Sequence, residues 1–330
     1  MERVLTASSQ CLKFITTEFT IKCKIQGAAA SVAAWSPKPR KLSTPTLTAA
    51  FLVPPSTSRV CCLSAREHTT NTGFYQNQAP LDNKVLKLIS GSCYLPHPDK
   101  EEIGGEDANF VLEQTIGIAD GVGGWAEVGI NAGDYARELM ANSVAAIQQE
   151  PESFIDPARV LEKAYLNTKS RGSSTACILT LSDRGLHAVN LGDSGFIVTR
   201  GHHTLFRSPI QQHSFNCSFQ LESGDGSDVP SSAQAFTIHV AQGDVIIAGT
   251  DGLFDNLYDS ELSALVVDAV ADRLGPQATA EKIASSARQR ALDKDKDTPF
   301  SDSAQSAGYW YRGGKLDDIT VVVSFVTAID

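Results

Sequence analysis

Aspartates border the most hydrophobic runs of this sequence. Asp120 and Asp251 each follow such a run, and the pair Asp317 and Asp318 precedes a third run at residues 319–323. If the runs are strands, carboxylates at their ends can converge at one edge of the fold although they are far apart in the sequence. A carboxylate cluster of this kind stays ionised only when a cation neutralises it. The sequence therefore predicts a cation site built from strand ends.

Three further acids lie beside predicted strands, namely Glu106, Asp107 and Asp193. Oxygen ligands without a neighbouring His or Cys favour Mg²⁺ or Mn²⁺ over zinc. Taken alone, each Asp-Gly pair is more simply explained as a turn, because this dipeptide is common in turns. The recurrence of acids at strand ends, with few polar residues inside the strands, favours the metal site.

The segments that carry these acids show helical and strand periodicities. Apolar residues within 132–147 recur at spacings of three and four, which predicts a helix capped by Asn131. Asp156, followed by a proline, predicts the start of a second helix over 157–169. The remaining expected elements are helices at 259–274 and 279–292 and strands at 111–119, 174–181, 186–191, 195–199, 204–207, 235–240, 244–248 and 319–326.

The order of these elements indicates a fold class. The strands between residues 174 and 248 are joined by short turns, so they should form antiparallel hairpins. The helices fall into two groups, one after each Asp-Gly pair. Runs of strands with segregated helices predict a sandwich of sheets flanked by helices on both sides, and not a doubly wound βαβ fold.

Six short glycine- and acid-containing motifs occur along the chain. They are Gly105-Glu106-Asp107-Ala108, Asp120-Gly121-Val122-Gly123-Gly124-Trp125, Gly172-Ser173-Ser174-Thr175-Ala176, Asn190-Leu191-Gly192-Asp193-Ser194, Gly249-Thr250-Asp251-Gly252-Leu253-Phe254-Asp255 and Asp317-Asp318-Ile319-Thr320-Val321. Over about residues 89–327 the chain thus resembles the type 2C metal-dependent serine/threonine protein phosphatases (the PPM family), in which these motifs occur in the same order. The Val-Gly-Gly-Trp version of the second motif and the Gly-Gly-Lys-Leu-Asp-Asp segment resemble its divergent organelle-associated branch.

The resemblance implies an α+β fold, a four-layer α-β-β-α sandwich of two antiparallel sheets flanked by helices, with two Mn²⁺ or Mg²⁺ ions at one end. Asp120 would bridge both ions, and Gly121 would offer its carbonyl oxygen to one of them. Asp251 and Asp317 would complete the other ion, so that the three aspartates are the implied catalytic residues. The implied reaction is hydrolysis of phosphoserine or phosphothreonine by a hydroxide that bridges the ions, without a phosphoenzyme.

The resemblance also implies supporting roles. Glu106 and Asp107 would bind metal directly or orient metal-bound water. Asp193 would hold a third, weaker ion or support the centre from outside the ligand shell. Asp318 stands where the family usually has Asn, so either Asp317 or Asp318 could be the ligand; the following Ile-Thr-Val aligns in favour of Asp317.

Two further positions depart from the family pattern. Val122 stands where many relatives have a His suited to protonating the leaving group, so another acid must act there. No Arg lies a few residues before the Glu-Asp-Ala motif, where many relatives bind phosphate. His97 or Lys100 are the candidates for that phosphate contact.

Residues 1–70 differ from the rest of the chain in charge. They hold nine Lys/Arg against three Asp/Glu, a charge of +6, and 18 of the 70 are Ser or Thr, whereas the other 260 residues carry −16. This composition is typical of an organelle transit peptide, and the lack of a clear Arg-rich amphipathic helix favours chloroplast over mitochondrion. A tail without an address is the alternative. The predicted organisation is a transit peptide at 1–70, a linker at 71–88 and a phosphatase domain at 89–327.

Charge and composition limit the possible partners. The formal net charge of −10 argues against nucleic acid, whose phosphates it would repel. No run reaches about 18 apolar residues, so no membrane span is expected. The expected protein is a monomeric, metal-dependent protein serine/threonine phosphatase acting on phosphorylated proteins. The alternatives are a catalytically weak relative that binds phosphoproteins or regulates them, and a small-molecule phosphatase on the same scaffold.

Overall fold

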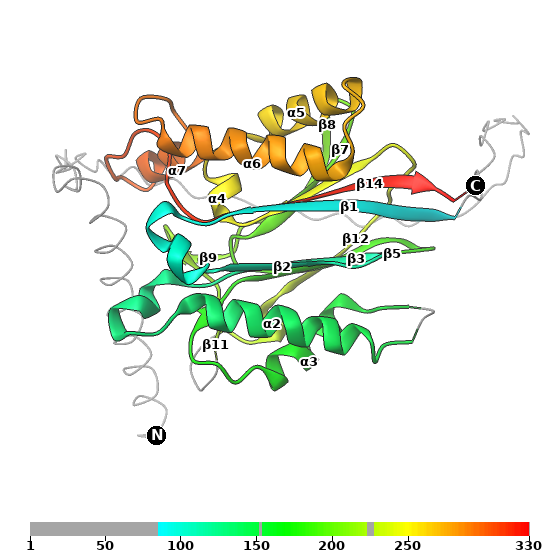
Figure 1. The fold of residues 1–330 in the computed structure, drawn as a ribbon, viewed down its shortest axis with the longest axis horizontal. Helices are drawn as coiled ribbons and strands as arrows, with labels where there is room; N and C mark the ends of the chain where they lie inside the picture. Colours follow the sequence, from blue (N-terminus) through cyan, green and yellow to red (C-terminus); the bar gives the residue numbers. More distant parts are fainter. Residues whose placement is uncertain (1–84, 152–153, 223–227, 330) are drawn as a thin grey trace, which may run out of the picture. The chain divides into compact units, whose positions relative to one another are not determined.

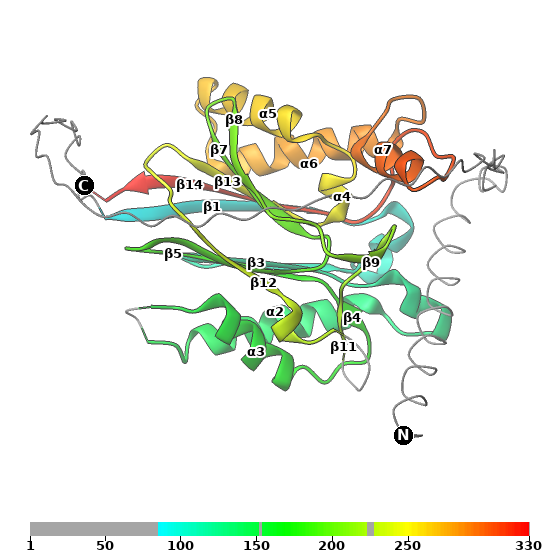
Figure 2. The same ribbon diagram turned by 180° about the vertical axis from the view of Figure 1, so that it is seen from behind.

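A computed structural model of the chain describes residues 85–151, 154–222 and 228–329. In them, two five-stranded antiparallel sheets face each other between two pairs of helices (Figures 1 and 2). The predicted transit peptide at 1–70 and most of the predicted linker at 71–88 lie outside the described residues. The first strand begins at Leu86, three residues before the predicted start of the domain.

The first sheet has the last strand of the chain near its centre. Its order is β1 (Leu86–Leu95), β14 (Ile319–Ala328), β13 (Val245–Gly249), β7 (Gly195–Arg200) and β8 (His203–Arg207). β1 was not among the predicted strands, because its serines and glycine break the hydrophobic alternation. β1 is instead held by ten consecutive pairs with β14, from Leu86 opposite Ala328 to Leu95 opposite Ile319.

The second sheet carries the first Asp-Gly pair at its end. Its order is β12 (Gln234–Ile238), β6 (Gly185–Leu191), β5 (Ala176–Ser182), β3 (Thr115–Asp120) and β2 (Asp107–Val111). The strand predicted at 111–119 is confirmed from Thr115 onward as β3, but a hairpin turn separates it from β2, which was not predicted. The amide of Leu112 closes that turn by donating to the carbonyl oxygen of Thr115 at 2.8 Å.

The chain changes sheets between β6 and β7. The predicted hairpins are confirmed for β5–β6 and β7–β8. Elsewhere the prediction is wrong, because β6 and β12 belong to the second sheet whereas β7, β8 and β13 belong to the first, so the chain also changes sheets between β8 and β12 and between β12 and β13. Gly192 in the connection has a φ of 102°, a left-handed conformation that favours glycine. The crossing places Asp193 at the end of the sandwich, where the chain passes from one sheet to the other.

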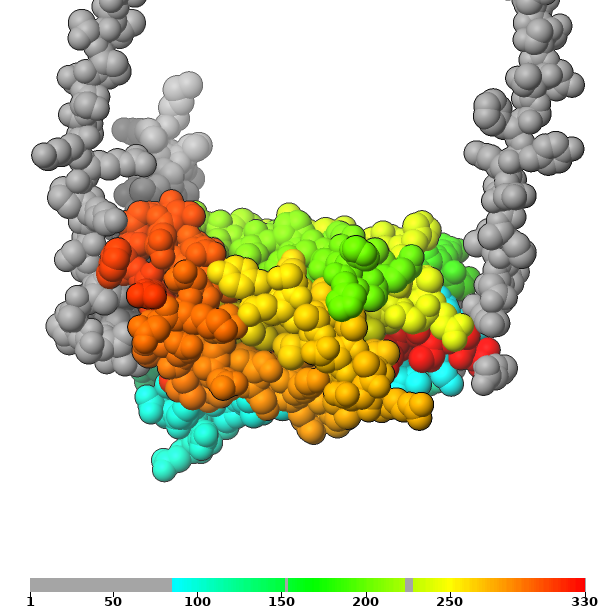
Figure 3. All heavy atoms as spheres, turned by 90° about the horizontal axis from the view of Figure 1, so that it is seen from above, coloured from blue at the N-terminus to red at the C-terminus, as the bar shows by residue number. Residues whose placement is uncertain are grey.

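Helices cover the outer face of each sheet. α2 (Ala132–Ile147) and α3 (Pro157–Asn167) pack on the second sheet, and α5 (Asp259–Ala271) and α6 (Pro276–Leu292) pack on the first (Figures 1 and 2). Figure 3 shows α5, α6 and α7 (Pro299–Ser306) forming the outer surface on that side. Both predicted caps are confirmed: Asn131 accepts from the amide of Gly133 and Asp156 from that of Ala158, each at 3.0 Å.

Three apolar cores hold the four layers together. One lies between the sheets and includes Ile116, Phe196 and Val322, all fully buried. The other two lie between each sheet and its helices. The predicted α+β fold, a four-layer sandwich of two antiparallel sheets flanked by helices, is therefore confirmed. Within the described ranges, no helix combines the length and apolarity needed to cross a membrane.

Short elements complete the structure. They are β4 (Ser173–Ser174), β9 (Gln212–Ser214), β10 (Cys217–Ser218), β11 (Leu221–Glu222), α4 (Asp251–Phe254) and the 3₁₀ helices η1 (Pro98–Ile103), η2 (Gly123–Val128) and η3 (Pro230–Ser232).

Candidate metal centre

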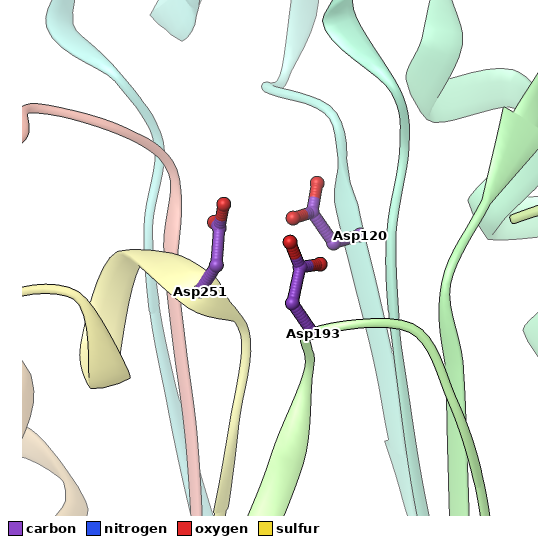
Figure 4. Close-up of side chains that lie close together, drawn as sticks. All are labelled: Asp120, Asp193 and Asp251. Carbon is purple, nitrogen blue, oxygen red and sulfur yellow. The ribbon is translucent and has the colours of Figure 1, made fainter. Parts of the chain in front are cut away.

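Three aspartates from separate parts of the chain meet at one end of the sandwich. Asp120 ends β3, Asp193 lies in the connection between the sheets, and Asp251 begins α4 (Figure 4). One carboxylate oxygen of each lies within 4.8 Å of those of the other two. The structure thus brings Asp120 and Asp251 together, and it adds Asp193 within the same limit.

Side-chain hydroxyls fix the position of Asp120. Its backbone amide donates to Thr175 Oγ1 at 3.1 Å, and that oxygen also lies 2.7 Å from Ser194 Oγ. Thr175 belongs to the Gly-Ser-Ser-Thr motif and Ser194 follows Asp193. The two motifs therefore act together, because a shared hydrogen-bond chain joins the ends of three strands.

The glycine of each Asp-Gly pair permits two backbone segments to approach closely. A Cβ on Gly121 would lie 2.6 Å from the carbonyl oxygen of Ala132, and one on Gly252 would lie 1.9 Å from that of Asp318. Neither glycine has a positive φ. Close packing, rather than the turn preference of the dipeptide, therefore requires glycine at both positions.

We expect Gly252→Ala to disrupt the centre by pushing α4 away from the start of β14. The free energy of unfolding should fall by about 2–4 kcal/mol, and Mn²⁺ affinity should fall with it. Thermal unfolding and calorimetric titration with Mn²⁺ measure both effects. Gly275→Ala is the control, because an added Cβ there meets nothing within 4 Å. Equal unfolding midpoints for the two variants would contradict this account.

Asp107 lies beside Asp120 on the neighbouring strand β2. It lies opposite Asp120 in the β2–β3 pairing and is only 3% exposed. Its Oδ2 accepts hydrogen bonds from Thr250 Oγ1 and Thr320 Oγ1, both at 2.8 Å. Its buried Oδ1 has no hydrogen-bond partner among the described residues. A buried acceptor left without a donor is a position where a cation or a bound water would be stabilised.

The electrostatics of the site fit a divalent cation. Burial, followed by the charges of Asp251 and Asp107, raises the pKa of Asp120 well above its ordinary range. Burial and the charge of Asp318 do the same to the pKa of Asp107. The carboxylates therefore repel one another and need positive charge. Because all the converging donor atoms are carboxylate oxygens, the residues fit Mg²⁺ or Mn²⁺.

Two lysines already supply some of that positive charge. Lys100 Nζ contacts Glu106 Oε2 and lies 3.3 Å from Asp318 Oδ2. Lys315 Nζ lies 2.5 Å from Asp251 Oδ2, and it is also close to Asp255 and Asp317. Lys315 was not among the predicted site residues. The sequence feature that could have indicated a role for Lys315 is its position two residues before the Asp317–Asp318 pair.

The remaining predicted residues separate into two groups. Asp317 Oδ2 faces Lys315 at 3.2 Å, on the same side as Asp251. Asp318 is bound instead by Tyr94 Oη at 3.0 Å and by the amide of His97 at 2.9 Å. Both carboxylates have protein donors, since Asp317 Oδ1 also accepts from the amide of Asp318 at 3.0 Å. Asp317 shares Lys315 with Asp251, whereas Asp318 shares Lys100 with Glu106.

The two candidates for the phosphate contact also differ. The Nδ1 atom of His97 accepts from the amide of Asp99 at 3.1 Å and so caps η1. Lys100 reaches the carboxylates and keeps 27% of its side chain exposed. Of the two, Lys100 is the residue whose charged group contacts predicted site carboxylates, those of Glu106 and Asp318.

The metal-free protein should become more stable as pH falls from about 8 to about 5. Burial, opposed by Lys315 and reinforced by Asp251, raises the pKa of Asp255 to about 7. In that window the folded chain binds a proton that the unfolded chain, with an ordinary carboxyl pKa, releases. The free energy of unfolding therefore increases as the pH falls through the pKa that Asp255 has in the folded chain. The increase is complete below the pKa that Asp255 has in the unfolded chain.

Thermal unfolding in EDTA across this range tests the pH dependence. Asp255→Asn should flatten the rise in the midpoint, because it removes the titrating group. A midpoint that falls as pH decreases through 7 would contradict the assignment.

Comparisons with known proteins place this geometry in a family. A family model described as "Protein phosphatase 2C" matches residues 118–287. "Probable protein phosphatase 2C 55" of Arabidopsis thaliana is 68% identical over 252 residues, which is 76% of this chain and 54% of that protein. "Probable protein phosphatase 2C 80" of the same plant is 59% identical over 281 residues, 82% of this chain and 68% of the relative. The match thus spans about half the length of the first of these relatives.

Solved structures of phosphatases are also similar to this chain. The photosystem II phosphatase PBCP is 35% identical, with a TM-score of 0.69, over 73% of this chain and all of that one. The catalytic domain of the serine threonine protein phosphatase PstP, solved with 2 manganese ions, is 15% identical with a TM-score of 0.51, over 74% of this chain and all of that one. At that identity the second likeness concerns the fold alone.

Proposed function

The chain belongs to the protein phosphatase 2C family, and from this premise we propose that it is a metal-dependent phosphatase that hydrolyses phosphoserine and phosphothreonine in proteins. The observation that carries the proposal is the convergence of Asp120, Asp193 and Asp251 within 4.8 Å at the end of the sandwich. A module that only binds phosphoproteins would have no need of buried carboxylates that repel one another, so a binding-only role is not favoured.

We propose that two Mn²⁺ or Mg²⁺ ions bind at this centre. Asp120 would be shared between them, with the Gly121 carbonyl oxygen on one ion and Asp251 and Asp317 on the other. When bound, the ions would make a water molecule nucleophilic near neutral pH and offset charge on the phosphoryl oxygens.

The protein's own residues would position these groups. Asp107, fixed by two threonine hydroxyls, and Glu106 would support the ions or orient water beside them. Asp193 would contribute directly, as its distance to Asp120 and Asp251 permits. Lys100 would contact the substrate phosphate, because it is the partly exposed cation at the edge of the cluster. Val122 has no proton to donate, so the leaving group must take its proton from water or another side chain.

The full chain tests this function directly. Purified protein should dephosphorylate a phosphothreonine peptide with Mn²⁺, lose that activity in EDTA and regain it when Mn²⁺ is restored. Small phosphoesters provide the comparison, since turnover of these alone would identify a small-molecule phosphatase. Mn²⁺ binding without turnover of either substrate would contradict the proposal.

We propose that the protein acts in the chloroplast, with a transit peptide at 1–70, a linker from residue 71 and a phosphatase domain that begins with β1 at Leu86, three residues before the predicted bound, and extends to about residue 327. The Ser/Thr-rich, basic composition of 1–70 supports this address. The 35% identical neighbour is named as a photosystem II phosphatase, which is consistent with it. Residues 1–70 fused to a fluorescent protein should enter chloroplasts; a mitochondrial or diffuse cytosolic signal would contradict this address.

A further inference from the structure

Lys315 is buried among the acids of the proposed metal centre. Its side chain is 6% exposed, and its Nζ lies 2.5 Å from Asp251 Oδ2, 2.7 Å from Asp255 Oδ2 and 3.2 Å from Asp317 Oδ2. A lysine ammonium carries three N–H donors and no acceptor. Three carboxylates therefore use all three donors, and none is left for a substrate phosphate.

The backbone of Lys315 is fixed as well. Asn256 Oδ1 accepts from the Lys315 amide at 3.0 Å, and Asn256 Nδ2 donates to the Lys315 carbonyl oxygen at 2.8 Å. The same Nδ2 donates to the carbonyl oxygen of Gly252 at 2.9 Å, which ties this segment to α4. The ring of Phe300 lies 5.3 Å from Nζ. Lys315 is thus built into the acid cluster and is not a surface side chain that happens to reach it.

Two of the carboxylates that Lys315 contacts are proposed metal ligands. Asp251 belongs to the group with Asp120 and Asp193, and Asp317 is the proposed partner of Asp251 on an ion. A divalent ion between Asp251 and Asp317 must therefore compete with an ammonium that is already there. Among the described residues, the carboxylates that pair with the Lys315 ammonium are Asp251, Asp255 and Asp317, so an ion held by Asp120 and Asp193 does not have to displace it.

We propose that Lys315 is an internal competing cation that weakens one of the two metal positions, so that the chain binds one divalent ion tightly and a second one weakly. This inference rests on the proposed metal centre. Like charges at these distances repel strongly in a partly buried site. The second ion therefore binds only when the Lys315 ammonium loses its contact with Asp251, with Asp317 or with both. Lys315 then keeps its contact with Asp255.

Calorimetric titration of the full chain with Mn²⁺ alone tests the proposal without measuring catalysis. Wild type should show two binding events with clearly separated Kd values. In Lys315→Met the weaker Kd should fall by about tenfold or more, because the competing charge is gone. Lys315→Arg, which keeps the charge, should not tighten that event.

Lys163→Met is the matched control. Lys163 Nζ lies 2.7 Å from the buried Glu150, so this variant also removes a lysine from a buried carboxylate, but on α3 and away from the centre. Its Mn²⁺ affinities should equal those of wild type. If Lys315→Met is too unstable to titrate, its unfolding midpoint should rise more on adding Mn²⁺ than that of wild type.

The outcomes separate this inference from the proposed function. If wild type binds Mn²⁺ and Lys315→Met binds it no more tightly, the competition is refuted while the metal centre stands. A smaller Mn²⁺-induced rise of the midpoint in Lys315→Met would refute it as well. If wild type binds no Mn²⁺, the metal centre itself is refuted.

Discussion

Asp120→Asn is expected to abolish Mn²⁺-dependent hydrolysis and, at the same time, to make the metal-free protein more stable. Asp120 lies within 4.8 Å of both Asp193 and Asp251, so its carboxylate is central to the proposed ions. Replacing it with a neutral amide should lower kcat/KM on a phosphothreonine peptide by about 10³-fold or more, because charge stabilisation at the reacting phosphoryl group is lost.

The gain in stability has a separate cause. Burial and the neighbouring acids raise the pKa of Asp120, which means that its charge is unfavourable in the folded chain. Its amide analogue keeps the shape and removes the repulsion. In EDTA at about pH 8 we expect an unfolding midpoint higher by about 3–8 °C, and Mn²⁺ should no longer raise it.

The same two measurements on Asp134→Asn provide the control. Asp134 is an exposed residue of α2 that pairs with Arg137 at 2.8 Å, and surface pairs of this kind contribute little. Activity and midpoint should both stay near wild type. A lower metal-free midpoint for Asp120→Asn would show that Asp120 stabilises the fold and would argue against repulsion at a metal centre.

Lys100→Met is expected to have the second large effect. Lys100 is the cation between Glu106 and Asp318, which are 4% and 3% exposed in their side chains. Removing it leaves two buried carboxylates without that partner. Breaking a buried ion pair costs about 3–5 kcal/mol, and because Lys100 is itself partly exposed we expect about 2–3 kcal/mol here.

Lys100→Met should also change the kinetics if Lys100 contacts the substrate phosphate. KM for the phosphopeptide should rise more than kcat falls, because ground-state binding of the dianion is lost. Lys282→Met is the control, since Lys282 pairs with the exposed Asp272 at 3.6 Å on the helical face. If Lys100→Met is as stable as wild type and has an unchanged KM, Lys100 neither stabilises the buried carboxylates nor contacts the substrate phosphate.

Local features of the fold were predictable from the sequence because their causes are local. The cap of α2 by Asn131 and that of α3 by Asp156 each depend on residues two positions apart. The hydrophobic runs that became β13 and β14 needed only their own composition. The split between β2 and β3 was missed, because the apolar residues continue across the turn and conceal it.

The approach of backbone segments was not predictable from the sequence. β1 has a weak hydrophobic pattern and exists through its pairing with β14, more than 220 residues away at every pair. The glycines of both Asp-Gly pairs could be read as turn residues until the structure showed the backbone oxygen that a Cβ would strike. Such contacts depend on which strands become neighbours, and a local pattern does not contain that information.

The sequence by itself determined the chemistry of this protein: acids at the ends of hydrophobic strands, the oxygen ligands that hard divalent cations prefer, and the motif order of one phosphatase family. Only the tertiary structure decided how those acids are arranged. It moved the chain between sheets at Asp193, turned Asp318 towards Tyr94 and His97, and placed Lys315 against Asp251, 64 residues earlier in the chain. The physical reason is that residue type fixes what an atom can bind, whereas the pairing of distant strands fixes which atoms lie within reach.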